Sequence, residues 1–117
     1  MANSDDKKVY MMVNKDSTTI KIGESKDPND RRKDGDVKEH GDFSVYRERP
    51  AVASTQAEEA AHRALMDKCG LERVPDTTDY FRQAGGKSGA KMSPRQLGNV
   101  WGEVCQAVDK SNIQEKN

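Results

Sequence analysis

Residues 8–32 read KVYMMVNKDSTTIKIGESKDPNDRR, and this stretch predicts the framework of the fold. It contains two short runs of β-forming residues, Lys8–Val13 and Thr18–Glu24. The four residues between them, Asn14-Lys15-Asp16-Ser17, favour turns. The stretch therefore predicts an antiparallel hairpin. Apolar side chains occupy both alternating sets of the first run, which predicts a strand in the interior of a sheet.

A helix is expected to follow the second strand. Asp27 is a good N-cap, and Pro28 suits the first helical position because no amide hydrogen is needed there. Gly35 is expected to end this helix. The second strand would then lead directly into a helix that carries Arg31 and Arg32.

The hairpin and the start of this helix resemble the core of the GIY-YIG nuclease superfamily. The likeness rests on Val9-Tyr10-Met11, on Lys21-Ile22-Gly23, and on Arg31 eight residues after the glycine. It is nearest to the small phage and bacterial branch, in which the second motif often reads Lys-Ile-Gly. The first motif lacks the family's glycine and isoleucine, and Lys21 replaces the second tyrosine. The resemblance implies an α+β fold with a small three-stranded, mainly antiparallel sheet flanked by helices.

The rest of the chain supplies further elements. Phe43–Arg49 is predicted to be a third strand, and Thr77–Phe81 a short last one. Between them, a helix is expected to begin with a capping-box pattern at Thr55 and to end at Gly70. Its apolar stripe consists mostly of alanine, so it would pack by close approach more than by bulk.

The C-terminal part is expected to add a separate amphipathic helix to a GIY-YIG-like domain at 8–83. Residues 84–92 have the composition of a flexible linker, and the helix follows over 93–110. Its apolar stripe has helical spacing and comprises Leu97, Val100, Trp101, Val104, Cys105 and Val108. Such a helix needs a surface to dock on, or it forms a homodimer through residues 94–108. Residues 1–7 and 111–117 are expected to be flexible ends.

Composition limits what this chain can be. With 117 residues, 32% hydrophobic and 34% charged, it suits one domain with a modest core. The formal net charge of zero argues against a general nucleic-acid coat, although a local basic patch remains compatible with it. Cys69 and Cys105 are far apart and have no metal-ligand spacing, so they are expected to be free thiols. We find no signal peptide and no long apolar run, which predicts a cytoplasmic protein without a membrane contact.

The resemblance also implies catalytic residues. Family members of this type use an arginine on the first helix, a tyrosine or a neighbouring base, and one glutamate that holds a single magnesium-type ion. On this chain these roles fall to Arg31, Tyr10 and Glu58. Lys21 and His62 are further catalytic candidates, and the implied cofactor is Mg²⁺ or Mn²⁺. Lys21 could contact phosphate as a point charge, or act as a base only if its pKa were depressed.

Four more residues are candidates for substrate binding. Gly23 allows close backbone approach at the strand end. Lys26 and Arg32 belong to a small basic cluster around the first helix. Asp79 occupies the place where related proteins carry a final acidic or amide residue near the site.

Each of these residues also has an ordinary structural interpretation. Tyr10 is then a strand aromatic, Lys21 a solvated strand lysine, and Arg31 part of a solvated charged patch. Glu58 is then the fourth residue of the capping box that begins at Thr55. His62, four residues after Glu58 on one helix face, is then a structural histidine.

Two main functional hypotheses follow, and DNA binding without cleavage is a third possibility. The first is a small metal-dependent endonuclease that hydrolyses phosphodiester bonds of DNA. The second is a catalytically inactive relative, such as a phage protein that binds and modulates a host protein or a DNA-processing enzyme. Neutral net charge and the altered motif residues favour the second hypothesis, whereas the retained motif positions favour the first.

Overall fold

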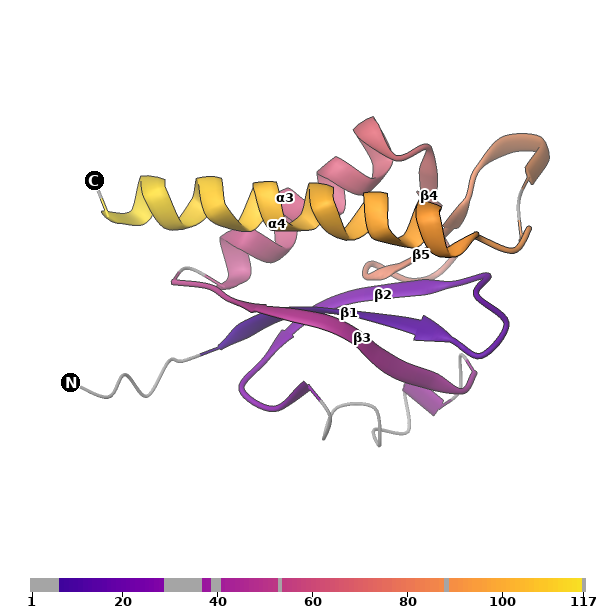
Figure 1. Ribbon diagram of the computed structural model, residues 1–117, viewed down its shortest axis with the longest axis horizontal. Coiled ribbons are helices and arrows are strands. Elements are labelled where there is room, and N and C mark those ends of the chain that lie inside the picture. Colours follow the sequence, from indigo (N-terminus) through magenta and orange to yellow (C-terminus); the bar gives the residue numbers. More distant parts are fainter. Residues whose placement is uncertain (1–6, 29–36, 39–40, 53, 88, 117) are drawn as a thin grey trace.

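The described part of the chain folds as an antiparallel sheet with two long helices on one side. The structure, a computed structural model, describes residues 7–28, 37–38, 41–52, 54–87 and 89–116. The strands are β1 (Lys8–Asn14), β2 (Ile20–Ser25), β3 (Phe43–Pro50), β4 (Leu71–Arg73) and β5 (Tyr80–Gln83). They form one sheet in the order β3-β1-β2-β5-β4. The helices are α3 (Ser54–Lys68) and α4 (Pro94–Lys116), with a short 3₁₀ turn at Gly85–Lys87 (Figure 1).

The predicted α+β class is confirmed, but the predicted three-stranded sheet is too small. β5 corresponds to the predicted last strand Thr77–Phe81, although it runs from Tyr80 to Gln83, and it pairs antiparallel with the additional strand β4, with Leu71 opposite Gln83. β4 has only three residues, two of them charged, so no alternating apolar pattern marks it in the sequence. All strand pairs that the structure describes are antiparallel.

The predicted hairpin is confirmed by the pairing of β1 with β2, in which Tyr10 lies opposite Gly23. β2 begins at Ile20 rather than at Thr18, because the Asn14 side chain holds the preceding residues in the turn. Its Oδ1 atom accepts hydrogen bonds from the amides of Thr18 at 2.8 Å and Thr19 at 3.0 Å. An asparagine side chain that binds backbone amides in this way stabilises a turn.

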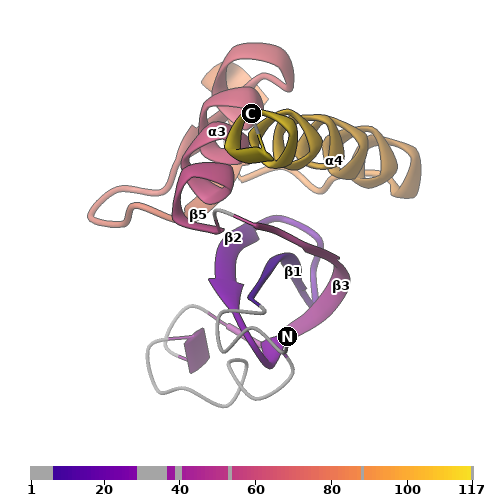
Figure 2. The same cartoon turned by 90° about the vertical axis from the view of Figure 1, so that its left-hand side faces the viewer.

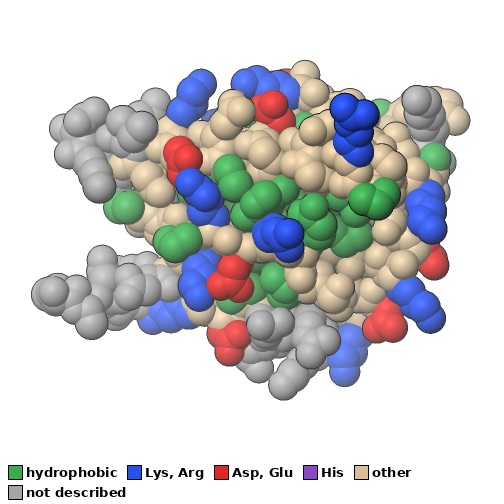
Figure 3. Space-filling model, in the orientation of Figure 1, with side chains coloured by type: hydrophobic (Ala, Val, Ile, Leu, Met, Phe, Trp, Pro, Cys, Tyr) green, Lys and Arg blue, Asp and Glu red, His purple; other side chains and the backbone are tan. Residues whose placement is uncertain are grey.

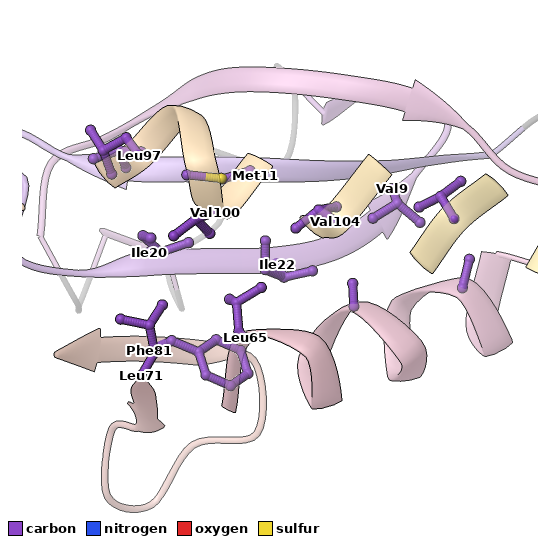
Figure 4. Close-up of a cluster of buried hydrophobic side chains, with 14 of the residues drawn as sticks. Val9, Met11, Ile20, Ile22, Leu65, Leu71, Phe81, Leu97, Val100 and Val104 are labelled. Carbon is purple, nitrogen blue, oxygen red and sulfur yellow. The ribbon is translucent and has the colours of Figure 1, made fainter. Parts of the chain in front are cut away.

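The sheet has an apolar layer on each face, as the two apolar sets of β1 predict. One set, which includes Val9 and Met11, packs under the helices together with Ile20 and Ile22 of β2 (Figure 4). The other set packs in a smaller cluster that consists of Tyr10, Met12, Val37, Phe43 and Tyr80. Figure 2 shows α3 and α4 together on one side of the curled strands, so the smaller cluster lies on the opposite side.

Helix α3 packs through an alanine-rich stripe, as predicted. Its buried residues are Ala57, Ala61, His62 and Leu65. The helix already includes Ser54, so Thr55 lies inside it and the predicted capping box is wrong. The Thr55 hydroxyl instead donates to Glu24 Oε2 at 2.9 Å, and the Ser54 hydroxyl donates to Glu24 Oε1 at 2.5 Å. These two hydroxyls tie the start of α3 to the end of β2.

Helix α4 belongs to the same hydrophobic core as the sheet. Val100, Val104 and Val108 are 0 to 1% exposed and belong to the larger hydrophobic cluster, which lies between the helices and the sheet. The segment expected to be a flexible linker, 84–92, carries Met92, which is 1% exposed and whose amide donates to Ser17 O at 2.8 Å. The composition of the segment did not predict that Met92 would be buried and hydrogen-bonded. The stripe proposed for a homodimer is therefore largely covered by the chain itself.

Helix α4 is also longer than the predicted 93–110. The Ser93 hydroxyl accepts from the Gln96 amide at 3.1 Å and so caps the helix start. At the other end the Asn112 side chain accepts from the Val52 amide at 2.8 Å. This contact holds part of the segment that was expected to be a flexible end. Among the helices that the structure describes, none has the length and apolar character that crossing a bilayer requires.

Candidate functional site at the edge of β2

The motif residues meet where the pairing of β2 with β5 ends, while β2 stays paired with β1. Pairing between β2 and β5 covers Ile20 with Phe81 and Lys21 with Tyr80. One further hydrogen bond joins the Ile22 amide to Asp79 O at 2.9 Å. Beyond this point the first turn of α3 borders β2, through the contacts of Glu24. We call the group formed by Tyr10, Lys21, Gly23, Glu58 and Asp79 the β2-edge site.

Tyr10 lies flat across Gly23 on the neighbouring strand. Its side chain is fully buried, at 0% exposure. A Cβ atom at Gly23 would overlap the Tyr10 hydroxyl oxygen and lie 2.7 Å from Cζ, which is closer than real Cβ contacts. The glycine is thus required by the tyrosine that packs over it. The hydroxyl lies inside the protein and makes no conventional hydrogen bond with any described residue.

Replacing Gly23 by alanine is expected to destabilise the protein by about 1 to 3 kcal/mol, because the added methyl group overpacks the contact with Tyr10. Urea unfolding of the two proteins measures the difference. Gly86→Ala is the matched control, since a Cβ there meets no atom within 4 Å. Equal effects in both variants would contradict a specific role of the Tyr10 contact.

Lys21 is a buried ammonium rather than a solvated strand lysine. It is 5% exposed, and its Nζ forms an ion pair with Asp79 Oδ2. The Nζ atom also lies 5.5 Å from the centre of the Tyr10 ring and 5.1 Å from that of Tyr80. Burial alone would lower the pKa of Lys21, but the hydrogen bond and charge of Asp79, together with Tyr10, raise the pKa above its ordinary value. These surroundings favour a permanent cation and do not suit a general base.

Within the β2-edge site, Glu58 is the carboxyl group whose ionised form is disfavoured. Burial, followed by the negative charges of Glu24 and Asp79, raises the pKa of Glu58 to about 7, while Lys21 acts in the opposite direction. Glu58 is half-buried, whereas the neighbouring candidate Glu59 is exposed. The Glu58 carboxyl makes no hydrogen bond with any described residue. It is therefore available to a cation or to a substrate proton.

His62 is placed differently from the other candidates. Its Nε2 lies 3.1 Å from Ile22 O, and its ring packs 5.2 Å from that of Phe81 on the helix side of the sheet. Burial lowers the pKa of His62 below its ordinary value. The neutral ring satisfies a carbonyl that β5 leaves unpaired. These contacts support the structural interpretation of His62.

The remaining predicted residues are not part of the β2-edge site as defined above. Lys26 is exposed. Arg31 and Arg32 lie outside the described residues, as does most of the helix that was predicted to follow Asp27. Sequence reasoning missed Glu24, whose carboxylate joins β2 to α3. Burial would raise the pKa of Glu24, but hydrogen bonds from Ser54 and Thr55 and the charge of Lys7 lower it. Its position directly after Gly23 was the available clue.

A divalent cation fits the chemistry of the site to a limited degree. Carboxylate oxygens are the ligands that Mg²⁺ and Mn²⁺ prefer, and Mg²⁺ often uses only one or two of them together with water and substrate phosphate. Asp79 is engaged with Lys21, and Glu24 with two hydroxyls, which leaves Glu58. No group of three or more potential ligands lies together among the described residues. The residues present therefore suit a cation shared between Glu58 and a bound phosphate.

The cysteines offer no alternative chemistry. Both are free, as predicted. Burial, followed by the charge of Glu103, raises the pKa of Cys69 to about 11, and burial also raises the pKa of Cys105. Thiolates are the reactive form, so neither thiol is activated at neutral pH.

Comparison with protein-family models, curated proteins and solved structures finds no match to this chain.

Proposed function

We propose that the β2-edge site binds and hydrolyses phosphodiester bonds of DNA, in the manner of the GIY-YIG nucleases that the hairpin resembles. The observation that supports this proposal best is the meeting of Tyr10, Lys21, Gly23, Glu58 and Asp79. They come from β1, β2, α3 and the loop before β5, yet they lie together where β2 extends past its pairing with β5. The charges of Lys21 and Asp79 both act on Glu58.

The roles follow from the contacts. Glu58 would hold a divalent cation, which would supply positive charge to the phosphoryl oxygens and the leaving alkoxide. Lys21 would provide a second positive charge from the strand. Gly23 keeps the strand free of side-chain bulk beneath Tyr10. By the resemblance, Arg31 would bind the scissile phosphate with its planar guanidinium.

Supercoiled plasmid tests this function. Purified protein with Mg²⁺ or Mn²⁺ is expected to convert plasmid to the nicked form, and Glu58→Gln and Arg31→Ala are each expected to reduce the rate at least about a hundredfold. Glu59→Gln is the matched control, because it removes an exposed carboxylate one residue away, and it is expected to cleave normally. Failure of the unmodified protein to cleave with either metal would overturn the proposal.

A non-cleaving protein that binds a protein partner is the second candidate. Two observations favour it: the Tyr10 hydroxyl is enclosed, and the Lys21 charge is already paired. Figure 3 also shows hydrophobic side chains gathered where α4 passes over β3, two elements that contribute the partly buried Tyr46 and Trp101. Absence of nicking, together with a dimer mass in light scattering, would favour this candidate with a second copy of the chain as the partner.

A further inference from the structure

We propose that Asp79 masks a phosphate-binding ammonium on Lys21, and that a DNA phosphate binds this site by displacing the Asp79 carboxylate. The inference rests on the proposed function, because it assigns the substrate contact and the regulation of the same site. It also reverses the role that the sequence suggests for Asp79. The carboxylate competes with the substrate and does not itself bind it.

Lys21 has the surroundings of a prepared anion site. The side chain is enclosed between the Tyr10 and Tyr80 rings, and only the Asp79 carboxylate pairs with its ammonium among the described residues. Folding has therefore already removed water from this cation. Hydrogen bonds between charged groups are stronger in such a setting than in water. A phosphate oxygen in place of Asp79 Oδ2 would make the same kind of contact.

Asp79 is the outer member of the pair. The side chain of Lys21 is 6% exposed, whereas that of Asp79 is 27% exposed. An anion that approaches from solvent would meet the carboxylate before it reaches the ammonium. The Asp79 carboxylate thus forms the solvent-facing side of the ion pair.

The backbone of Asp79 is fixed independently of its side chain. Its carbonyl oxygen accepts from the Ile22 amide at 2.9 Å, which holds the loop against β2. Rotation of the carboxylate would release Lys21 while this hydrogen bond stays in place. Unmasking therefore requires a side-chain rotation and no opening of the sheet.

The charges around the pair explain why a mask has an effect. Glu58 and Glu24 add negative charge near Lys21, and Glu24 is held by Ser54 and Thr55. At neutral pH Glu58 is only partly ionised, and Glu24 is paired with Lys7 at 3.6 Å, so Asp79 is the carboxylate that cancels the charge of Lys21. Loss of the Asp79 charge shifts this balance at the only buried lysine among the described residues.

Binding of a short fluorescent DNA duplex in EDTA tests the mask without any cleavage step. Asp79→Asn is expected to bind about fivefold to tenfold more tightly than the unmodified protein, as one added charge-assisted phosphate contact implies. The logarithmic dependence of affinity on salt should also become steeper by about one phosphate contact. In the double variant with Lys21→Gln the gain should disappear.

Asp76→Asn is the matched control, because it removes an exposed carboxylate from the same loop. Asp76 has φ +66°, a conformation that asparagine also adopts readily. Equal gains in Asp79→Asn and Asp76→Asn would reveal a general charge effect and overturn the mask. Weaker or absent binding by Asp79→Asn would overturn it as well.

Amide NMR spectra verify folding, and Asp79→Ser serves as a second variant. If both variants are unfolded in the absence of DNA, refolding on addition of the duplex would support the mask, and failure to refold would overturn it. If the mask is confirmed while plasmid stays intact, the protein binds DNA without cutting it, so failure of the proposed cleavage is distinguished from failure of this inference.

Discussion

Glu58→Gln is expected to stabilise the protein above pH 7, although the proposed function expects the same substitution to slow cleavage. The pKa of Glu58 is raised from 4.5 to about 7, so the folded state favours the protonated carboxyl. Stability from this preference is fully present below the unfolded pKa and is lost as the pH rises through about 7. The full displacement corresponds to about 3 kcal/mol as an upper limit, and solvent screening of a half-buried group reduces the expected gain to about 1 to 2 kcal/mol. Glutamine does not ionise and avoids this loss.

Urea unfolding at pH 8 and near pH 4.5 measures the effect. The difference in the free energy of unfolding between the variant and the unmodified protein should be positive at pH 8 and shrink toward zero at the lower pH. Glu59→Gln, on the exposed side, should show no such dependence on pH. If the free energies of unfolding of the two proteins stay equal at pH 8, Glu58 is an ordinary surface carboxylate. Its pKa is then not raised in the way that is common at functional sites.

Removal of residues 93–117 is expected to unfold the whole protein, rather than merely to prevent association. Helix α4 buries Leu97, Val100, Val104 and Val108 against the shared core. Each such side chain contributes about 1.5 to 3 kcal/mol on burial, and the sum is comparable to the 5 to 15 kcal/mol that stabilises a typical domain. Circular dichroism and the dispersion of amide NMR signals would both report the loss of structure.

Single substitutions give a graded form of the same test. Val104→Ala is expected to destabilise the protein by about 2 to 3 kcal/mol, because it leaves a cavity between α4 and the sheet. Gln106→Ala, at an exposed position of the same helix, should change stability by less than about 0.5 kcal/mol. A truncated chain that still unfolds cooperatively would contradict this account of α4 as part of the core.

Sequence patterns among neighbouring residues predicted those elements of the fold that depend on neighbouring residues alone. Strand alternation and turn residues identified the hairpin, and the spacing of apolar residues identified both long helices. They did not locate β4, whose three residues become a strand only by pairing with β5. They also placed the start of α3 at Thr55, because the hydroxyls that suggested a cap bind Glu24, a residue thirty positions away in the chain. Contacts of this range leave no local pattern.

The candidate site likewise has some features that local patterns predict and others that depend on contacts between distant parts of the chain. The spacing of motif positions brought attention to Tyr10, Lys21, Gly23 and Glu58, and the structure places them together. Burial of Lys21 could not be predicted from β2 alone, because the Asp79 carboxylate and two aromatic rings enclose it. His62 matched a helical spacing with Glu58, yet the unpaired carbonyl of Ile22 determines its role. Only the assembled sheet edge reveals that carbonyl.

Titration of ¹⁵N-labelled protein with a short DNA duplex and Mg²⁺ tests the central claim most directly. The account predicts that the largest amide shift changes lie at Lys21–Glu24, at Glu58 and at Asp79, with little change at Gln106 on the exposed face of α4. It also predicts that Glu58→Gln weakens the Mg²⁺-dependent part of these changes. Changes confined to α4, or none at all, would contradict a DNA-binding site at the edge of β2.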